Sequence, residues 1–178
     1  MNLLRIAYVL GAMLSLALLH TPALAEPHHT KLAGFQEVPV VVTGGSGQFE
    51  MKIAPGDGSF DFVLSYEGIE GGAVQQAHIH VGQRNVNGGI VVFLCTNLTP
   101  PSGVPTPPPC PAPPGMVTGT RTSADVLSQT TQGVSAGELS AVLTAVRKGR
   151  AYANVHSASS PGGEIRGQIS RGGHDDDD

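Results

Sequence analysis

Short runs of alternating apolar and polar residues, separated by turn signals, constrain the fold of this chain more than any other feature. Residues 48–53 and 59–66 both alternate in this way, and a Pro-Gly-Asp-Gly turn signal at 55–58 lies between them. Because successive side chains of a β-strand point to opposite faces, the two runs predict an antiparallel hairpin. Further candidate strands cover 31–35, 74–82, 90–95, 151–156 and 164–170. Many short strands with Gly-rich turns predict an all-β fold, an antiparallel sandwich or barrel.

One segment near 135–148 has helical periodicity instead. Its apolar residues recur at the i, i+3, i+4, i+7 spacing and are Leu139, Val142, Leu143 and Val146. Ser135 and Glu138 have the spacing of a capping box, and Gly149 is suited to end the helix. Because this spacing produces one apolar face, we expect the helix to cover an open edge or end of the sheet. A shorter helical turn is predicted at 123–126.

The first 25 residues have the pattern of a secretory signal peptide. Arg5 supplies a positive charge, residues 6–19 are apolar, and the Ala-Leu-Ala sequence at 23–25 is a small-x-small cleavage signal. The apolar run is too short for a membrane span, which favours a signal peptide over a membrane anchor. The Ala-Leu-Ala signal places the expected cleavage after Ala25. The prediction is an extracytoplasmic protein, periplasmic or secreted, with no transmembrane segment after cleavage and with a flexible start at 26–30.

The charge of the chain is close to balanced outside its last residues. The sequence has 10 Lys and Arg residues against 14 Asp and Glu residues, and four of the acidic residues form the terminal run 175–178. The chain lacks the basic stripe that nucleic-acid-binding proteins present, so a nucleic-acid partner is excluded. We expect 172–178 to be an acidic disordered tail, either native or left over from protein production.

Two cysteines enclose most of a Pro-rich segment at 99–114. In an oxidising compartment, Cys95 and Cys110 predict a disulfide. A Cys-based metal site is disfavoured because no Cys-x-x-Cys pair is present. The proline density blocks a helix or a central strand. We expect a surface loop pinned by the disulfide, in preference to a polyproline ligand for another protein.

Three histidines form the candidate site. His78 and His80 flank Ile79, so on a strand both imidazoles point to one face. His156 follows Val155 in a similar run. With Ile79 and Val155 turned inward, the outer face carries Gln76, His78, His80, Asn154 and His156.

Imidazole ligands suit copper and zinc, and the first-row affinity order favours Cu(II) over Zn(II). The pattern predicts an open three-histidine metal site of His78, His80 and His156, in which Gln76, Asn154 or Glu164 orients an imidazole. An alternative stays equally open at this point. The histidines would then only form hydrogen bonds, with Glu164 paired to one of them, and Asn154 and His156 would satisfy the backbone of the turn at 157–163.

Several segments together resemble the CHRD domain, which was named after chordin and occurs in many bacterial secreted proteins. They are Phe35-Gln36-Glu37-Val38-Pro39, residues 77–82, Asn154-Val155-His156 and residues 161–168. The resemblance covers nearly all of the chain after the signal peptide, and we place the domain at 31–171. It implies an extracytoplasmic β-rich domain whose molecular activity is poorly defined.

A weaker resemblance links the histidine motifs to Cu/Zn superoxide dismutase, a Greek-key β-sandwich with a His-x-His strand and a later Val-His strand. It implies a Greek-key sandwich or barrel, superoxide-dismutase-like or Ig-like, and copper ligands at His78, His80 and His156. No histidine lies between His80 and His156 to bridge two metals. Glu164 lies where that enzyme has an arginine that attracts superoxide. The likeness therefore favours the fold more than the activity.

These observations favour a non-catalytic binding module for a protein or envelope partner, with a copper or, less favoured, a zinc site. A copper-dependent redox enzyme resembling superoxide dismutase is the alternative. No catalytic residue is assigned, because the sequence has neither a Gly-x-Ser-x-Gly motif nor a Gly-rich phosphate loop that opens a helix.

Overall fold

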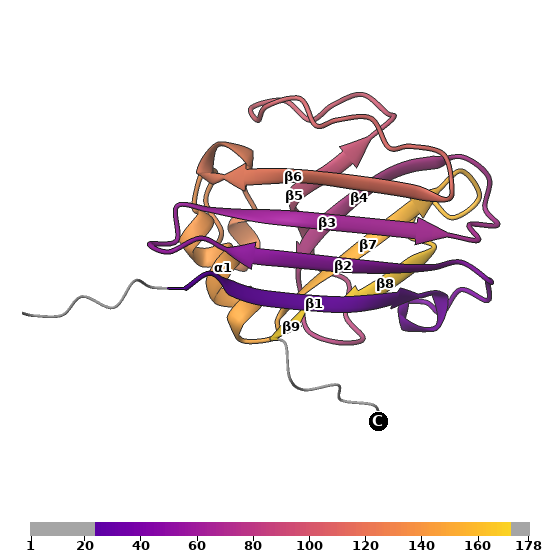
Figure 1. Cartoon of the computed structure of the whole chain (residues 1–178), viewed down its shortest axis with the longest axis horizontal. Helices are drawn as coiled ribbons and strands as arrows, with labels where there is room; N and C mark the ends of the chain where they lie inside the picture. Colours follow the sequence, from indigo (N-terminus) through magenta and orange to yellow (C-terminus); the bar gives the residue numbers. More distant parts are fainter. Residues whose placement is uncertain (1–23, 172–178) are drawn as a thin grey trace, which may run out of the picture.

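The computed structural model describes residues 24–171, and its elements confirm the all-β prediction (Figure 1). The strands are β1 Glu26–Ala33, β2 Ser46–Ile53, β3 Ser59–Glu67, β4 Val74–Val81, β5 Gly89–Thr96, β6 Gly115–Thr122, β7 Ala151–Ser157, β8 Ile165–Gln168 and β9 Ser170–Arg171. The helical elements in this part of the chain are α1 Leu139–Arg147 and the 3-10 turns η1 Gly34–Gln36, η2 Ser123–Asp125 and η3 Thr130–Gln132.

The strands form one antiparallel sheet in the order β5-β4-β7-β8-β1-β2-β3-β6, and β9 pairs with β1. The sheet curls so that β6, β3, β2 and β1 lie in front of β5, β4, β7 and β8 and cross them (Figure 1). Its two edge strands meet through one side chain. Arg121 on β6 donates hydrogen bonds to the carbonyl oxygens of Phe93 and Leu94 on β5, at 2.9 Å each. The result is a nearly closed barrel.

The core is built by the inward positions of each alternating run. The predicted hairpin is confirmed, with Ile53 opposite Phe60 in the β2–β3 register. The inward side chains of these two strands are fully or almost fully buried and are Phe49, Met51, Ile53, Phe60, Phe62 and Leu64. The opposite layer contributes Ala77 and Ile79 from β4 and Ala153 and Val155 from β7. The apolar face of β4 and β7 is therefore committed to the barrel interior.

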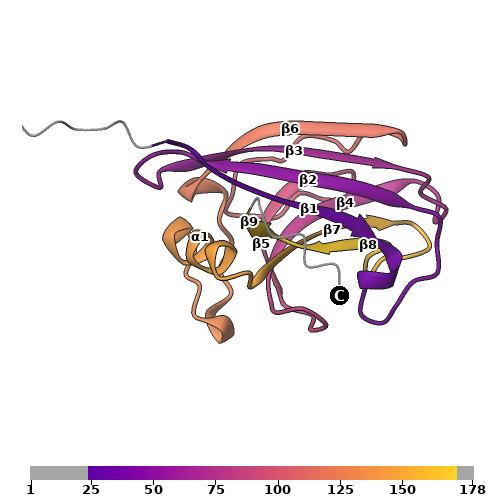
Figure 2. The same cartoon turned by 60° about the horizontal axis from the view of Figure 1, so that its bottom comes forward.

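Helix α1 covers one end of the barrel (Figure 2). Its predicted apolar face is confirmed, because Leu139, Val142, Leu143 and Val146 are all buried. The helix begins at Leu139, later than the capping-box spacing predicts. Glu138 still accepts a hydrogen bond from the backbone N–H of Ser135 at 2.9 Å, but Ser135 belongs to the turn before the helix. Gly149 has a φ of 61° just beyond the end of the helix, as expected for a glycine stop.

One expectation about the strands was wrong, and one strand was not predicted. Residues 26–30 are not a flexible start, because they pair along β2 as the first part of β1. Strand β6 was not predicted, because two of its positions are glycine. A Cβ at Gly115 would lie 2.5 Å from the Tyr66 ring, and one at Gly119 would lie 3.1 Å from the Phe62 ring. The aromatic rings of β3 thus occupy the space that side chains at positions 115 and 119 would need. Without apolar side chains at these positions, β6 lacks the alternation that predicts a strand.

The predicted disulfide is present between Cys95 and Cys110. Asn97 also ties the two ends of the Pro-rich loop. Its side chain donates to the carbonyl oxygen of Cys110 at 2.8 Å and accepts from the Cys110 N–H at 3.1 Å. Tyr66 on β3 adds another contact with the loop: its hydroxyl donates a hydrogen bond to the Pro111 carbonyl at 2.6 Å. The loop is therefore anchored to the barrel at several points.

The predicted signal peptide up to residue 23 and the predicted tail at 172–178 lie outside the described residues. Within residues 24–171, no helix has the length and apolar character needed to cross a membrane.

Candidate metal centre

The three histidines lie on neighbouring antiparallel strands, β4 and β7. In their register, Gln76 is opposite His156, His78 is opposite Asn154, and His80 is opposite Tyr152. Because Ile79 and Val155 point into the barrel, the histidines share the other face, as the alternation predicts. Sequence positions 78 residues apart are thus brought side by side by the pairing of two strands.

The imidazoles converge on a small volume. Each of the three histidines offers one ring nitrogen such that all three nitrogens lie within 4.8 Å of one another. His78 Nδ1 and His156 Nε2 are 3.2 Å apart. The ring centroids of His78 and His80 are 5.5 Å apart. The structure therefore brings together the residues that the sequence singled out as one candidate site.

The site is buried, whereas we expected its face to be open. The exposed fractions of His78, His80 and His156 are 0 %, 6 % and 5 %. Rings from both neighbouring strands enclose it. Phe93 on β5 packs edge-on against His78 with centroids 4.3 Å apart, and Tyr152 lies parallel to His80 at 4.6 Å. The prediction was right about the face and wrong about its exposure, because turns after β4 and β7 fold back over it.

These turns set the tautomers of two histidines. His80 Nδ1 donates to the Gly88 carbonyl at 2.9 Å, and His156 Nδ1 donates to the Pro161 carbonyl at 2.9 Å. A neutral imidazole has only one N–H, so each Nε2 keeps a lone pair that is free for a ligand bond. His80 Nε2 and His78 Nε2 are buried without a hydrogen-bond partner among the described residues.

Burial keeps the imidazoles neutral. Desolvation, followed by the neighbouring His156 and His80, lowers the pKa of His78 to about 2. Desolvation also lowers the pKa of His80 to about 4, although the hydrogen bond to Gly88 opposes it. The pKa of His156 is lowered as well, mainly by burial. Neutral imidazole is the form in which histidine can serve as a metal ligand.

One contact in the cluster is unfavourable between neutral, metal-free groups in the orientation that the Asn154 amide has here. His156 Nε2 lies 3.1 Å from Asn154 Oδ1, while His156 Nδ1 lies 2.9 Å from the Pro161 oxygen. Both partners are acceptors, and a neutral ring has one proton to donate. A lone pair therefore faces a lone pair at one of the two contacts. A cation placed between Asn154 and the imidazoles would turn this repulsion into attraction.

The residues predicted to orient the imidazoles differ in their positions. Asn154 contacts His156, as just described. Gln76 is half-buried and opposite His156 in the register. Glu164 points elsewhere: its carboxylate accepts from the Thr43 hydroxyl at 2.8 Å and from the Glu70 and Gly71 N–H groups at 2.8 and 3.0 Å. Burial acts to raise the Glu164 pKa, but these hydrogen bonds and the neighbouring Ser157 lower it overall.

Sequence reasoning missed three residues around the centre. Tyr152 lies on His80, and the Arg166 guanidinium lies 3.4 Å above the Tyr152 ring. Glu37 is buried, and desolvation raises its pKa to about 7 against the opposing effects of Arg166 and Asn154. Tyr152 shares the outward alternation of His156, a signal that could have identified it. Glu37 lies in the 35–39 segment quoted for the family resemblance, which could have marked it.

A positive group near the centre was not expected, since Glu164 was placed where superoxide dismutase has its arginine. Arg166 supplies one, but it is almost fully buried. Its guanidinium donates to the carbonyl oxygens of Gln83 and Val86 and to the side chain of Asn87. Arg166 therefore holds the turn after β4 in place over the histidines.

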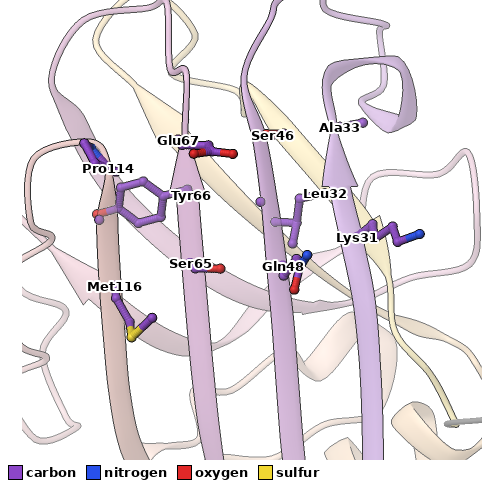
Figure 3. A pocket seen from close by; sticks show the side chains of 12 residues that line it. Lys31, Leu32, Ala33, Ser46, Gln48, Ser65, Tyr66, Glu67, Pro114 and Met116 are labelled. Carbon is purple, nitrogen blue, oxygen red and sulfur yellow. The ribbon is translucent and has the colours of Figure 1, made fainter.

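A hollow of about 620 Å³ lies away from this centre (Figure 3). It is lined by β1, β2, β3 and β6, with Leu32, Gln48, Tyr66 and Met116 among its walls. None of the three histidines lines it. The hollow and the histidine cluster are thus separate features.

Comparison with known protein families identifies the family of this chain. No curated protein and no solved structure matches this chain at the threshold of the search, so no resemblance to superoxide dismutase is shown. The family model of the CHRD domain matches residues 29–169, which include the barrel strands and all three histidines. The chain belongs to the CHRD domain family.

Proposed function

We propose that this protein is a secreted or periplasmic binding module that holds one copper ion, or less favourably zinc, through His78, His80 and His156. The observation that carries the proposal is the convergence of three buried, neutral imidazoles whose ring nitrogens lack enough donors to satisfy one another. Buried polar groups in native proteins are normally paired, and unpaired ones mark a functional site or an absent ion.

The spacing of the nitrogens supports a metal. Metal–nitrogen bonds to imidazole are about 2.0–2.1 Å long, so two ligands of one tetrahedral ion lie about 3.3 Å apart. His78 Nδ1 and His156 Nε2 are 3.2 Å apart. The ligand nitrogens of all three histidines lie within 4.8 Å of one another, and His80 Nε2 has no hydrogen-bond partner to give up.

The hydrogen bonds around the site support the same proposal. Ligand histidines normally donate their second ring N–H to a carbonyl or carboxylate group, which fixes the tautomer and raises ligand basicity. The Gly88 and Pro161 carbonyls do this for His80 and His156. Imidazole ligands favour Cu(II) among the common divalent ions. An oxidising compartment, which also suits the disulfide, is where we place the protein.

A titration of the purified, tag-free protein with Cu(II), monitored by EPR, tests this function. We expect one tightly bound equivalent in the wild type and loss of tight binding in His78→Ala/His80→Ala/His156→Ala. His29→Ala is the matched control, because it removes an imidazole from β1 and should leave the titration unchanged. Equal tight binding by wild type and triple variant would contradict the proposal.

A further inference from the structure

Asn154 lies between the histidines and a buried carboxyl group. Its Oδ1 is 3.1 Å from His156 Nε2. Its Nδ2 is turned the other way, toward Glu37, because Asn154 Nδ2 and Glu37 Oε1 border the same space beside Gly163. The side chain itself is 2 % exposed. The amide therefore presents its oxygen to the imidazoles and its N–H groups to the carboxyl.

The surroundings leave little room for another arrangement. Gly163 passes so close that a Cβ there would overlap Glu37 Oε1 and lie 2.8 Å from Asn154 Nδ2. Gly163 also has a φ of 124°, which a residue with a side chain adopts only with strain. Glu37 Oε1 is buried and has no hydrogen-bond partner among the described residues. A glycine thus makes the space in which the carboxyl and the amide meet.

We propose, on the basis of the metal centre inferred above, that Asn154 Oδ1 is the fourth ligand of the ion and that Glu37 is the positioning residue that aims it. The contact that is repulsive between neutral groups becomes a shared bond to the cation. Two ligand atoms 3.1 Å apart also match the edge of a tetrahedral site, about 3.3 Å.

Glu37 acts on the orientation of the amide. A side-chain amide can rotate by half a turn, and the rotated form would direct an N–H group at the ion. A carboxyl oxygen accepts hydrogen bonds, so it retains the orientation in which Nδ2 faces Glu37 and Oδ1 faces the ion. The same arrangement affects selectivity. An oxygen ligand beside three imidazoles favours Cu(II) and Zn(II) over Cu(I), which prefers sulfur ligands.

The test compares Cu(II) binding and the Cu(II) EPR spectrum across variants of the full mature chain. Asn154→Ala should weaken binding by about 10- to 100-fold or more, the range for loss of a group that supports a metal ligand. Asn154→Asp keeps the shape and replaces a neutral oxygen with a charged one. It should retain binding and shift the copper hyperfine splitting. His29→Ala on β1 is again the control and should match the wild type in both readouts.

The role of Glu37 needs a separate pair of variants. Glu37→Met removes the acceptor and should weaken binding by about 10-fold and alter the spectrum. Glu37→Gln removes the charge but keeps an acceptor oxygen, so it should restore most of the binding and the wild-type spectrum. Thermal unfolding of each metal-free variant confirms that it is folded.

The outcomes separate the two proposals. A wild type that binds no Cu(II) overturns the metal centre itself. Wild-type binding, with spectra of Asn154→Ala and Asn154→Asp identical to it, leaves the three-histidine centre standing and overturns the fourth ligand. A Glu37→Met variant indistinguishable from the wild type overturns the positioning role of Glu37.

Discussion

Two buried polar clusters lie on neighbouring parts of this barrel and are satisfied to very different degrees. The carboxylate of Glu164 is 1 % exposed and accepts hydrogen bonds from Thr43, Glu70 and Gly71. The histidine centre is equally buried, yet it leaves His78 Nε2 and His80 Nε2 without partners. A polar group whose role is structural is expected to be fully paired, because an unpaired one costs stability. The difference supports a structural role for Glu164 and the ligand site that we propose at the histidines.

Replacing Glu164 should have the largest effect. Glu164→Ala would leave a hydroxyl and two backbone N–H groups buried without an acceptor. Removing one partner of a buried hydrogen bond costs about 1–3 kcal/mol, so we expect a loss of about 3 kcal/mol or more in the free energy of unfolding. Urea denaturation of the metal-free protein measures it. A loss below about 1 kcal/mol would contradict the structural role of Glu164.

Adding metal should have the next largest effect, on the histidine centre alone. An ion that binds only the folded state stabilises it by about 2.7 kcal/mol when its free concentration is 100 times the dissociation constant. We expect Cu(II) to raise the free energy of unfolding of the wild type by about this amount. The same addition should have no effect on the variant in which His78, His80 and His156 are all alanine. Equal stabilisation of both proteins would show that copper binds elsewhere.

On acidification, the histidine centre and the Glu164 cluster should lose their contributions to stability in different pH ranges. The pKa of His78 is lowered on folding, so the unfolded chain takes up a proton first, below its ordinary pKa of 6.5. Stability is then fully present above pH 6.5 and falls as the pH drops toward the folded pKa, by at most about 1.4 kcal/mol per pH unit for each such group. Glu164, whose pKa is also lowered, contributes stability that is lost only below its ordinary value of 4.5.

The measurement is urea unfolding of the metal-free protein at pH 7 and pH 5. His78→Leu removes one of the titrating groups and should flatten the dependence in this range. Glu37 acts in the opposite sense, since its raised pKa of about 7 makes the folded state hold a proton that the unfolded chain releases. Its stabilisation is present below pH 4.5 and is lost as the pH rises through 7. A His78→Leu variant with the slope of the wild type would contradict the assigned shift.

The strand alternation predicted the face of the histidines but not that of Glu164, and it predicted the hydrogen-bond partners of neither cluster. It placed His78, His80 and His156 together, because a period of two fixes the face of each residue in any strand pairing. It could not place Glu164, whose partners Glu70 and Gly71 lie in a turn without periodicity. Nor could it show the burial of the histidines, since the carbonyl groups that hold them come from the turns at Gly88 and Pro161. Backbone acceptors carry no sequence signal.

The same limit explains why Glu37 was missed and β6 was not predicted. Glu37 lies in the segment between β1 and β2, and only the folded chain places it beside Asn154 on β7. Strand β6 lacks apolar alternation because Gly115 and Gly119 make room for the rings of Tyr66 and Phe62. In both cases the informative fact is a contact between distant parts of the chain.

The smallest predicted effect concerns Tyr152, which both contacts the histidine centre and forms a structural hydrogen bond. Its ring packs on His80, and its hydroxyl oxygen accepts a hydrogen bond from the Gly88 N–H at 3.1 Å. The Gly88 carbonyl in turn holds His80 Nδ1. Tyr152→Phe keeps the stacked ring and leaves one N–H without its acceptor. We expect a loss of about 1 kcal/mol in the free energy of unfolding, typical of a single neutral hydrogen bond.

The effect of the same variant on copper binding decides whether the turn at Gly88 also contributes to the proposed metal site. If the turn at Gly88 serves only to stabilise the fold, Cu(II) affinity should be unchanged in Tyr152→Phe. If the turn also aims His80, affinity should fall by several-fold, because a group that orients a ligand contributes to metal binding. We expect the second result, since His80 Nε2 is available to the ion only while Nδ1 is held by Gly88. Unchanged affinity alongside reduced stability would place Gly88 with Glu164, as structure without a part in binding.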